Sequence, residues 1–345
     1  MSPATLRATS SRAAAVAGAL MIGLAPASAA LAWGATGHRF IGTLGVVTLP
    51  PETPAFLRTT EVAMDVGELS REPDRWKGAG KTHDTMRDPA HYVDVDDDGK
   101  ILGGPALNDL PATRAGYEAA LRAVGTDSYK AGYLPYSIVD GWQQLAKDFA
   151  YWRVLQAAIP REKIPERKAW MQRDLARRET LTINDLGIWS HYVGDASQPM
   201  HVSVHFNGWG AYPNPKGYTQ EHVHVPFEGE FVYRNVSLEQ VFAAMAPSQP
   251  CEEAIEICTE RYLQATAATV EPFYALRKSG GFLSGDRRGP AFARERIAAG
   301  ASALRDFIIA AWRASAKGSV GYPALSVDQV VNRGADPYSA LYGDD

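Results

Sequence analysis

The sequence predicts a mainly α-helical protein whose helices form a single domain. Apolar residues recur at helical spacing over long stretches; Trp142, Leu145 and Phe149, for example, fall on one face of the stretch 137–159. Strict alternation of apolar and polar residues, which is typical of strands, is scarce. No internal repeat or low-complexity linker divides the chain after its first 32 residues, so the remaining length suits one large domain.

Three further stretches have the helical pattern, at 162–198, 257–278 and 288–318. We expect the little strand structure of the chain around 91–95 and 227–234, where apolar and polar residues alternate briefly.

Long loops are expected at 76–90 and 202–221. The two cysteines, Cys251 and Cys258, could form a disulfide across a short loop in an oxidising compartment. They could equally be two unpaired thiols on one helix, because sequence spacing alone does not determine the geometry.

Residues 1–32 have the features of an export signal. Arg7 and Arg12 make its start positive, an uncharged apolar run of about a dozen residues follows, and Ala-Leu-Ala precedes Trp33. An uncleaved anchor is the alternative, but the run is shorter than the roughly 20 residues that cross a bilayer as a helix. We therefore expect a secreted or periplasmic protein with no stable membrane anchor, beginning at Trp33.

The processed chain would consist of a domain at 33–325 and an irregular tail at 326–345. Loss of residues 1–32 removes two arginines and no acidic residue, which changes the formal net charge from −4 to −6. Such a chain lacks the basic surface with which proteins hold nucleic acid by phosphate neutralisation alone. Phosphate binding would need a more local feature, such as metal ions. Nothing in the sequence predicts a protein partner.

The densest group of candidate metal ligands is the segment 191–201, HYVGDASQPMH. If the segment before Pro199 is helical, His191 and Asp195 are i,i+4 neighbours on one face. Pro199 should end that helix, since it has no N–H to donate, and His201 could then fold back toward the same place. Imidazole and carboxylate ligands together suit zinc.

A second pair of candidate ligands, His224 and Glu228, is also four residues apart, with Pro226 tolerable between them only in the first turn of a helix. Asp74 and His91 are further candidates. The remaining histidines are expected in solvent or behind the ligands rather than as ligands; they are His83, His205 and His222.

The acidic segment 94–99 begins like a calcium-binding loop, with Asp94, Asp96 and Asp98 followed by Gly99. The twelfth position, which needs a bidentate glutamate, is Pro105, so an acidic turn in solvent is favoured. The zinc-protease HExxH motif, the GxSxG motif and the Walker loop are all absent from the sequence.

Taken together, the motifs WGATGH, PD, AHYVD, HYVGDASQPMH and HVPFE resemble the trinuclear-zinc superfamily. This superfamily contains the single-strand-specific nucleases of the S-one/P-one type and the bacterial zinc-dependent phospholipases C. The resemblance runs from Trp33 to Glu228. It implies a multi-helix domain of the zinc-dependent nuclease/phospholipase C type that hydrolyses phosphodiesters with three zinc ions.

The resemblance also implies the ligands of each ion. Trp33 would bind the first zinc through its free α-amine and carbonyl, so export cleavage would create a ligand. His38 would share that zinc, and Asp195 would bridge it to a second zinc. The second site would be completed by Asp74, His91 and His191, and the third by His201, His224 and Glu228.

Several departures bear on the substrate and the catalytic groups. The first carboxylate ligand, Asp74, follows a proline, whereas in the nucleases it lies in a Trp-Ala-Asp sequence. Lys77 stands where the nucleases have an arginine. Asp65 is a rival to Asp74 for the role of ligand. Glu228 is typical of the phospholipases, whereas the short Trp33–His38 spacing is typical of the nucleases. The stretch NGWGAYPNPKGYTQ replaces the Gly-Gly-Asn of the nucleases.

The matching nuclease positions imply that Tyr92 stacks on a base and that Asp94 forms hydrogen bonds with it. Asp74 would orient the attacking water molecule, and Lys77 would help to stabilise the charge that develops during the reaction. The favoured function is therefore a nuclease for single-stranded DNA or RNA, with 3′-nucleotidase activity as a further candidate. A phospholipase C is the alternative, and a non-catalytic zinc-binding protein is a third hypothesis.

Overall fold

A computed structural model of the 345-residue chain describes residues 33–343. The predicted export signal at 1–32 lies outside the described residues. The prediction of a mainly helical single domain is confirmed: helices dominate, and the described strands are a two-residue antiparallel pair, Ser319–Val320 with Leu325–Ser326. Within residues 33–343, the helices fall short of the length and apolarity that crossing a bilayer demands.

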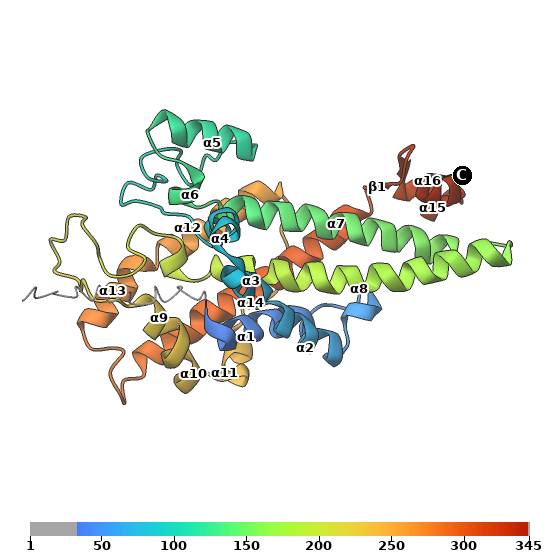
Figure 1. The fold of residues 1–345 in the computed structure, drawn as a ribbon. Coiled ribbons are helices and arrows are strands. Elements are labelled where there is room, and N and C mark those ends of the chain that lie inside the picture. The colour runs from blue at the N-terminus through green and yellow to red at the C-terminus, as the bar shows by residue number, and fades with distance from the viewer. Residues whose placement is uncertain (1–32, 344–345) are drawn as a thin grey trace, which may run out of the picture.

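The centre of the fold is a long antiparallel hairpin of α7 (Leu134–Ala158) and α8 (Pro165–Asp195), which projects beyond the other helices (Figure 1). Proline stands in the first turn of both helices, where its missing N–H has no intrahelical partner to lose. Three helices pack around the inner part of this hairpin: α1 (Gly34–Val47), α2 (Thr60–Leu69) and α14 (Arg288–Ser315).

Glycines allow these helices to approach closely. A Cβ on Gly187 of α8 would lie 2.3 Å from Leu69 Cβ of α2, and one on Gly45 of α1 would lie 2.6 Å from Leu304 Cδ2 of α14. This packing fixes α1, α2 and α8 relative to one another at the end of α8 that carries His191.

Shorter helices complete the domain. In chain order they are α3 Glu72–Trp76, α4 Lys81–Arg87, α5 Arg114–Ala123, α6 Ser128–Ala131, α9 His224–Pro226, α10 Val232–Asn235, α11 Leu238–Ala244, α12 Ile255–Ala267, α13 Val270–Lys278, α15 Val327–Val331 and α16 Tyr338–Tyr342. Cys251 and Cys258 form a disulfide, which settles the alternatives left open by their spacing.

Two predicted segments differ from the structure. The expected loop at 76–90 is largely helical, because its helices are too short for their periodicity to be recognised in the sequence. The expected strand at 227–234 is a π-helical turn, Phe227–Phe231, followed by α10. Phe227 and Phe231 stack at i,i+4, with 6.0 Å between ring centroids, so two apolar residues that fit alternation also fit a helical face.

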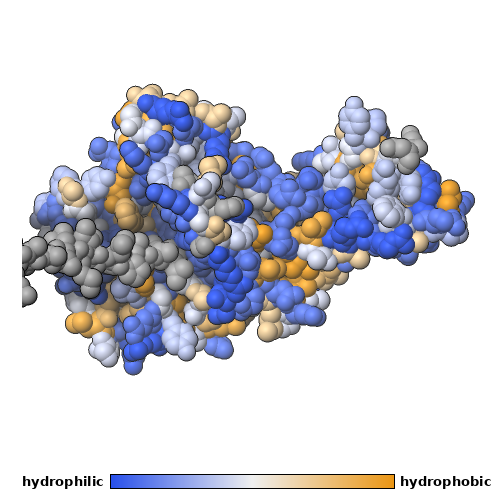
Figure 2. All heavy atoms as spheres, in the orientation of Figure 1, coloured by the Kyte–Doolittle hydropathy of each residue, from blue (hydrophilic) through white to orange (hydrophobic). Residues whose placement is uncertain are grey.

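The prediction of an irregular C-terminal tail is also wrong. Residues 319–342 form the strand pair, α15 and α16, and they pack on the outer part of the α7–α8 hairpin (Figure 1). Val327 and Val330 are buried there against Val154 and Leu155, which makes a second apolar core separate from the main one. On the face shown in Figure 2 the surface is a mosaic of hydrophilic residues with smaller apolar patches between them.

Candidate metal centre

The end of α8 presents His191 and Asp195 one helical turn apart, and both side chains are fully buried. Pro199 lies just beyond the end of the helix and begins a 3₁₀ turn, Pro199–His201. The Gln198 side chain accepts the Met200 N–H at 2.8 Å and stabilises this turn. His201 is thereby returned toward the helix end, as the sequence predicted.

The predicted ligand side chains gather in three groups, in each of which one candidate ligand atom per residue lies within 4.8 Å of the others. His191 belongs to the first two groups, which places them side by side. The first group is His38, Asp74 and His191; the second is His91, His191 and Asp195; the third is His201, His224 and Glu228.

Asp195 lies between the first two groups. Its Oδ1 is 3.5 Å from His38 Nε2, and its Oδ2 is 3.2 Å from His191 Nε2 and 3.1 Å from His91 Nδ1. Asp74 Oδ1 is 3.9 Å from His191 Nε2, whereas the rival Asp65 is exposed on α2. The structure therefore brings Asp74, and not Asp65, to the cluster.

Many buried polar atoms of these residues lack hydrogen-bond partners, as is expected of groups that bind metal ions. Seven of the eight candidate ligand side chains contribute nitrogen or oxygen atoms with no hydrogen-bond partner among the described residues; these atoms include His38 Nε2, Asp74 Oδ1, His91 Nε2, Asp195 Oδ1, His201 Nε2, His224 Nε2 and Glu228 Oε1. A buried polar atom without a partner costs about 1–3 kcal/mol. Convergent imidazoles and carboxylates of this kind fit divalent cations, zinc in particular.

Backbone carbonyls orient two of the imidazoles. Each ring donates its Nδ1–H over 2.7 Å, His191 to the Ser70 carbonyl and His201 to the His91 carbonyl. Because a carbonyl can only accept, Nε2 of each ring carries the lone pair and faces the cluster. Gln198 Nε2 donates to Glu228 Oε2 at 2.9 Å. The sequence contains no signal for the roles of Ser70 and Gln198.

Burial sets the protonation of the histidines. It lowers the pKa of His38 and His91 well below the ordinary value, and it lowers the pKa of His191 to about 4 against the opposing charge of Asp74. The three rings are therefore neutral near pH 7, which is the form that binds a metal.

Burial affects the carboxyls in two ways. It raises the pKa of Asp195. For Glu228, burial would also raise the pKa, but the charge of His224 and hydrogen bonds with His201 and His224 outweigh it and lower the pKa to about 2.

The buried neutral histidines predict how the metal-free protein responds to acid. Unfolded histidine has a pKa near 6.5, so between about pH 6.5 and 4 the unfolded state binds more protons than the folded state, and acid favours unfolding. His191 alone should lower the free energy of unfolding by about 2 kcal/mol between pH 7 and 5. Urea unfolding of chelator-treated protein at both pH values measures this, and His191→Gln should reduce the dependence; an unchanged dependence would contradict it.

Trp33 is fully buried at the start of α1, against the end of α8. Its indole Nε1 donates to the Gly194 carbonyl at 3.0 Å and to Ser197 Oγ at 2.8 Å. A Cβ on Gly34 would lie 2.9 Å from the Glu228 carbonyl oxygen, so the backbone here also borders the segment that carries Glu228. The start of the predicted domain thus lies beside the clustered ligands.

A pocket of about 280 Å³ opens beside the cluster. It contains three other residues that the sequence singled out, Lys77, Tyr92 and Asp94. Lys77 Nζ lies 3.1 Å from Asp74 Oδ1 and 3.6 Å from Asp88 Oδ1. Burial raises the pKa of Asp94 well above its ordinary value. The other lining residues are Asp88, His91, Lys130, Met200, His201, Phe206 and His224.

The acidic segment is a turn, as favoured from the sequence. Its central carboxylate, Asp96, accepts the backbone N–H groups of Asp98, Lys100 and Gly103 at 2.9–3.0 Å, so its oxygens are engaged within the turn.

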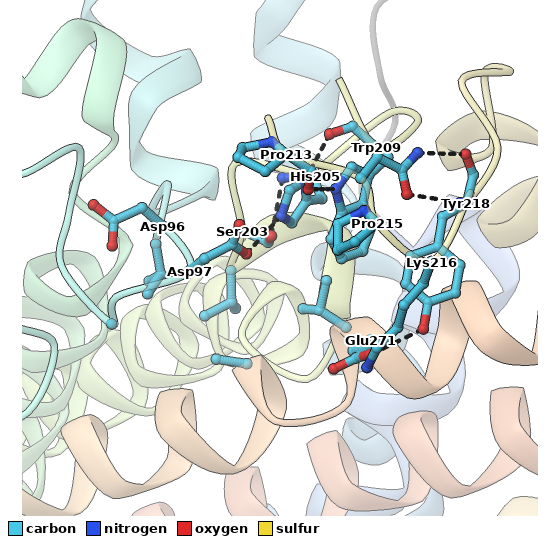
Figure 3. Close-up of a pocket in the computed structure, with 16 residues that line it drawn as sticks. Asp96, Asp97, Ser203, His205, Trp209, Pro213, Pro215, Lys216, Tyr218 and Glu271 are labelled. Carbon is cyan, nitrogen blue, oxygen red and sulfur yellow. Dashed lines mark hydrogen bonds and ion pairs between the residues drawn. The ribbon is translucent and has the colours of Figure 1, made fainter. Parts of the chain in front are cut away.

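His205 has a structural role that the sequence did not reveal. Its Nδ1 lies 2.7 Å from the Trp209 carbonyl and its Nε2 lies 2.8 Å from Asp97 Oδ1, while its ring stacks on Trp209 (Figure 3). These contacts fasten the 202–221 segment to the acidic turn. A cavity of about 500 Å³ lies beside this segment, lined in part by Asp97, His205 and Trp209 and by none of the candidate metal ligands. His222 is exposed and pairs with Asn207.

No protein-family model matches the chain, and no curated protein matches it. Among solved structures, the chain is similar to the alpha-toxin of Clostridium perfringens isolated from avian strain SWCP, with 15% identity and a TM-score of 0.40. The alignment covers 83% of this chain and 67% of the toxin chain. A likeness this distant supports no inference about the site.

Proposed function

We propose that this protein is an exported zinc-dependent phosphodiesterase that cleaves single-stranded DNA or RNA, with three zinc ions bound by the domain that starts at Trp33. The observation that carries the proposal is the convergence of eight candidate ligand side chains, seven buried and one half-buried, many with unpartnered atoms, beside a pocket that contains Lys77, Tyr92 and Asp94. A role in 3′-nucleotide hydrolysis fits the same pocket.

Bound zinc ions would supply Lewis-acid chemistry, lowering the pKa of a water molecule and neutralising charge on the phosphoryl oxygens. Asp74 and Lys77 are the residues of the chain placed to assist. Burial would raise the pKa of Asp74, but the interactions with His191 and Lys77 outweigh it and lower the pKa, so the carboxylate is ionised and can orient a water molecule by accepting its proton in a hydrogen bond. Burial would lower the pKa of Lys77, but Asp74 and Asp195 outweigh it and raise the pKa, which keeps a positive charge beside the pocket.

The favoured substrate follows from the pocket wall. Tyr92 offers an aromatic ring, and single strands expose base faces on which aromatic side chains stack. Asp94 lines the same pocket, and its carboxyl oxygens can accept hydrogen bonds from a base. A duplex keeps its bases inside and cannot place one in a pocket of about 280 Å³.

A phospholipase C is the second candidate. Glu228 favours it, because the resembling phospholipases carry glutamate at this position and the nucleases carry aspartate. The 202–221 segment, which departs from the nuclease pattern, also contributes Phe206 to the pocket.

The proposal predicts faster hydrolysis of single-stranded DNA than of duplex DNA or phosphatidylcholine at equal zinc and salt. Tyr92→Ala should lower kcat/KM on single strands about tenfold by removing a stacking platform, with zinc content unchanged. Tyr129→Ala is the matched control, because Tyr129 is an exposed tyrosine outside the pocket wall. If phosphatidylcholine is the best substrate and Tyr92→Ala does not affect DNA cleavage, the phospholipase hypothesis replaces the nuclease hypothesis.

A further inference from the structure

The pocket beside the metal centre has an outer wall that neither the sequence motifs nor the proposed chemistry uses. Lys130, from α6, and Phe206, from the 202–221 segment, both line the pocket. Both side chains are exposed, Phe206 by 47%. An exposed aromatic ring and an exposed cation therefore line the same pocket as the buried His91 and His201.

The two lysines of the pocket differ in their charge partners. Lys77 is paired with Asp74 and Asp88. For Lys130, by contrast, no carboxylate of residues 33–343 lies within ion-pair distance of the ammonium group. The charge of Lys130 is thus available to an anion that enters the pocket, whereas the charge of Lys77 is already engaged beside the metal ligands.

The short helix that carries Lys130 is held in place by its neighbours. The Asp127 carboxylate accepts the Lys130 N–H at 3.1 Å, and Glu118 Oε2 accepts the Ser128 N–H at 3.0 Å. The Tyr92 hydroxyl donates to the Tyr129 carbonyl at 2.7 Å. Tyr92 is therefore both a wall of the pocket and a tether for the turn that presents Lys130.

Phe206 also projects from an anchored backbone. The preceding residue, His205, is fixed by its contacts with Asp97 and Trp209, and the side-chain oxygen of the following residue, Asn207, accepts the Val223 N–H at 3.1 Å. An exposed aromatic residue whose two neighbours are anchored needs little backbone ordering when a planar ligand stacks on it.

Aromatic rings combined with cations are the usual means of holding single-stranded nucleic acid, since the ring stacks on a base and the cation contacts a phosphate. The same cation would repel the quaternary ammonium group of a choline lipid. We propose that Lys130 and Phe206 form a second nucleotide subsite, in which Phe206 stacks on the base next to the cleaved phosphodiester and Lys130 binds the flanking phosphate. This inference rests on the proposed nuclease function and extends it.

Lys130→Met tests the phosphate contact. On an oligothymidylate eight nucleotides long, KM should rise about 5- to 10-fold through loss of one charged contact. The slope of log kcat/KM against log salt should become shallower by about 0.7, the value for one phosphate of a single strand. Hydrolysis of bis(p-nitrophenyl) phosphate, which has no flanking phosphate, should be unchanged. Lys163→Met, at the exposed tip of the α7–α8 hairpin, is the control for loss of a positive charge elsewhere.

Phe206→Ala tests the stacking contact, and it should raise KM for the oligothymidylate while leaving zinc content unchanged. If both variants resemble wild type on the oligothymidylate, the subsite is disproved while the nuclease proposal stands. If wild type cleaves the small diester but no oligonucleotide, the proposed function itself is wrong. Faster phosphatidylcholine hydrolysis by Lys130→Met than by wild type would also overturn the subsite, by indicating a lipid head group there.

Discussion

Asp195→Asn is expected to lower phosphodiesterase activity by more than about 100-fold and to remove more than one equivalent of zinc. Changes behind a metal ligand already cost 10- to 100-fold in affinity or activity, and Asp195 lies between two of the three ligand groups. Asparagine keeps the size of the side chain but removes the negative charge that would be shared by two cations. The effect should therefore exceed that of His201→Ala, which belongs to one group.

Elemental analysis after purification without chelator, combined with rates on single-stranded DNA, measures both effects. Asp174→Asn is the matched control: Asp174 is another buried aspartate of α8, but it contacts Arg177 and Tyr342 rather than the ligand groups. It should lower stability and leave zinc content unchanged. Equal zinc contents in the Asp195→Asn protein and wild type would count against a shared carboxylate.

A chain that retains Ala32 in front of Trp33 is expected to bind one zinc fewer and to lose at least about tenfold in activity. The reason is the proposed ligation by the free α-amine of Trp33, whose pKa near 8 lets zinc displace its proton at modest cost. An additional residue converts that amine into an amide, which is a far poorer ligand. The buried position of Trp33 beside the end of α8 leaves little freedom for a substitute ligand to enter.

Comparing this chain with the one that starts at Trp33, by zinc content and rate, tests the prediction. Trp33→Phe in the shorter chain separates ligation from packing, since it keeps the amine but removes the indole hydrogen bonds to Gly194 and Ser197. That variant should lose stability yet keep its zinc. Full metal content and activity in the chain with Ala32 would refute a role for the amine.

The sequence predicted the parts of the site that depend on local geometry. The long periodic stretch around 162–198 predicted α8, the four-residue spacing placed His191 and Asp195 together, and Pro199 predicted the return of His201. These features need only the pitch of a helix and the missing N–H of proline.

The features of the site that depend on tertiary packing could not be predicted from the sequence. Whether Asp74 or Asp65 reaches the cluster depends on how α2 and α3 pack on α8, and the carbonyls of Ser70 and His91 that orient two imidazoles have no side-chain signature. Lys130 was missed for the same reason: its place on the pocket wall is set by contacts of α6 with residues far away in sequence.

The irregular tail was predicted wrongly because its elements are only two to five residues long. Such elements have little propensity of their own and form only because Val327 and Val330 find an apolar surface on the α7–α8 hairpin.

Helix α8 therefore passes through two apolar cores, with Met171 in the outer one and the ligand His191 at the other end. A fluctuation that opens the outer core would leave the candidate ligand groups assembled, so zinc binding would not change its free energy. Zinc binding would suppress only those openings that separate the ligand groups. Amide hydrogens on one continuous helix should then report two regimes. The exchange rate of the amides around Met171 should not depend on zinc concentration. The exchange rate of the amides around His191 should fall as zinc is added.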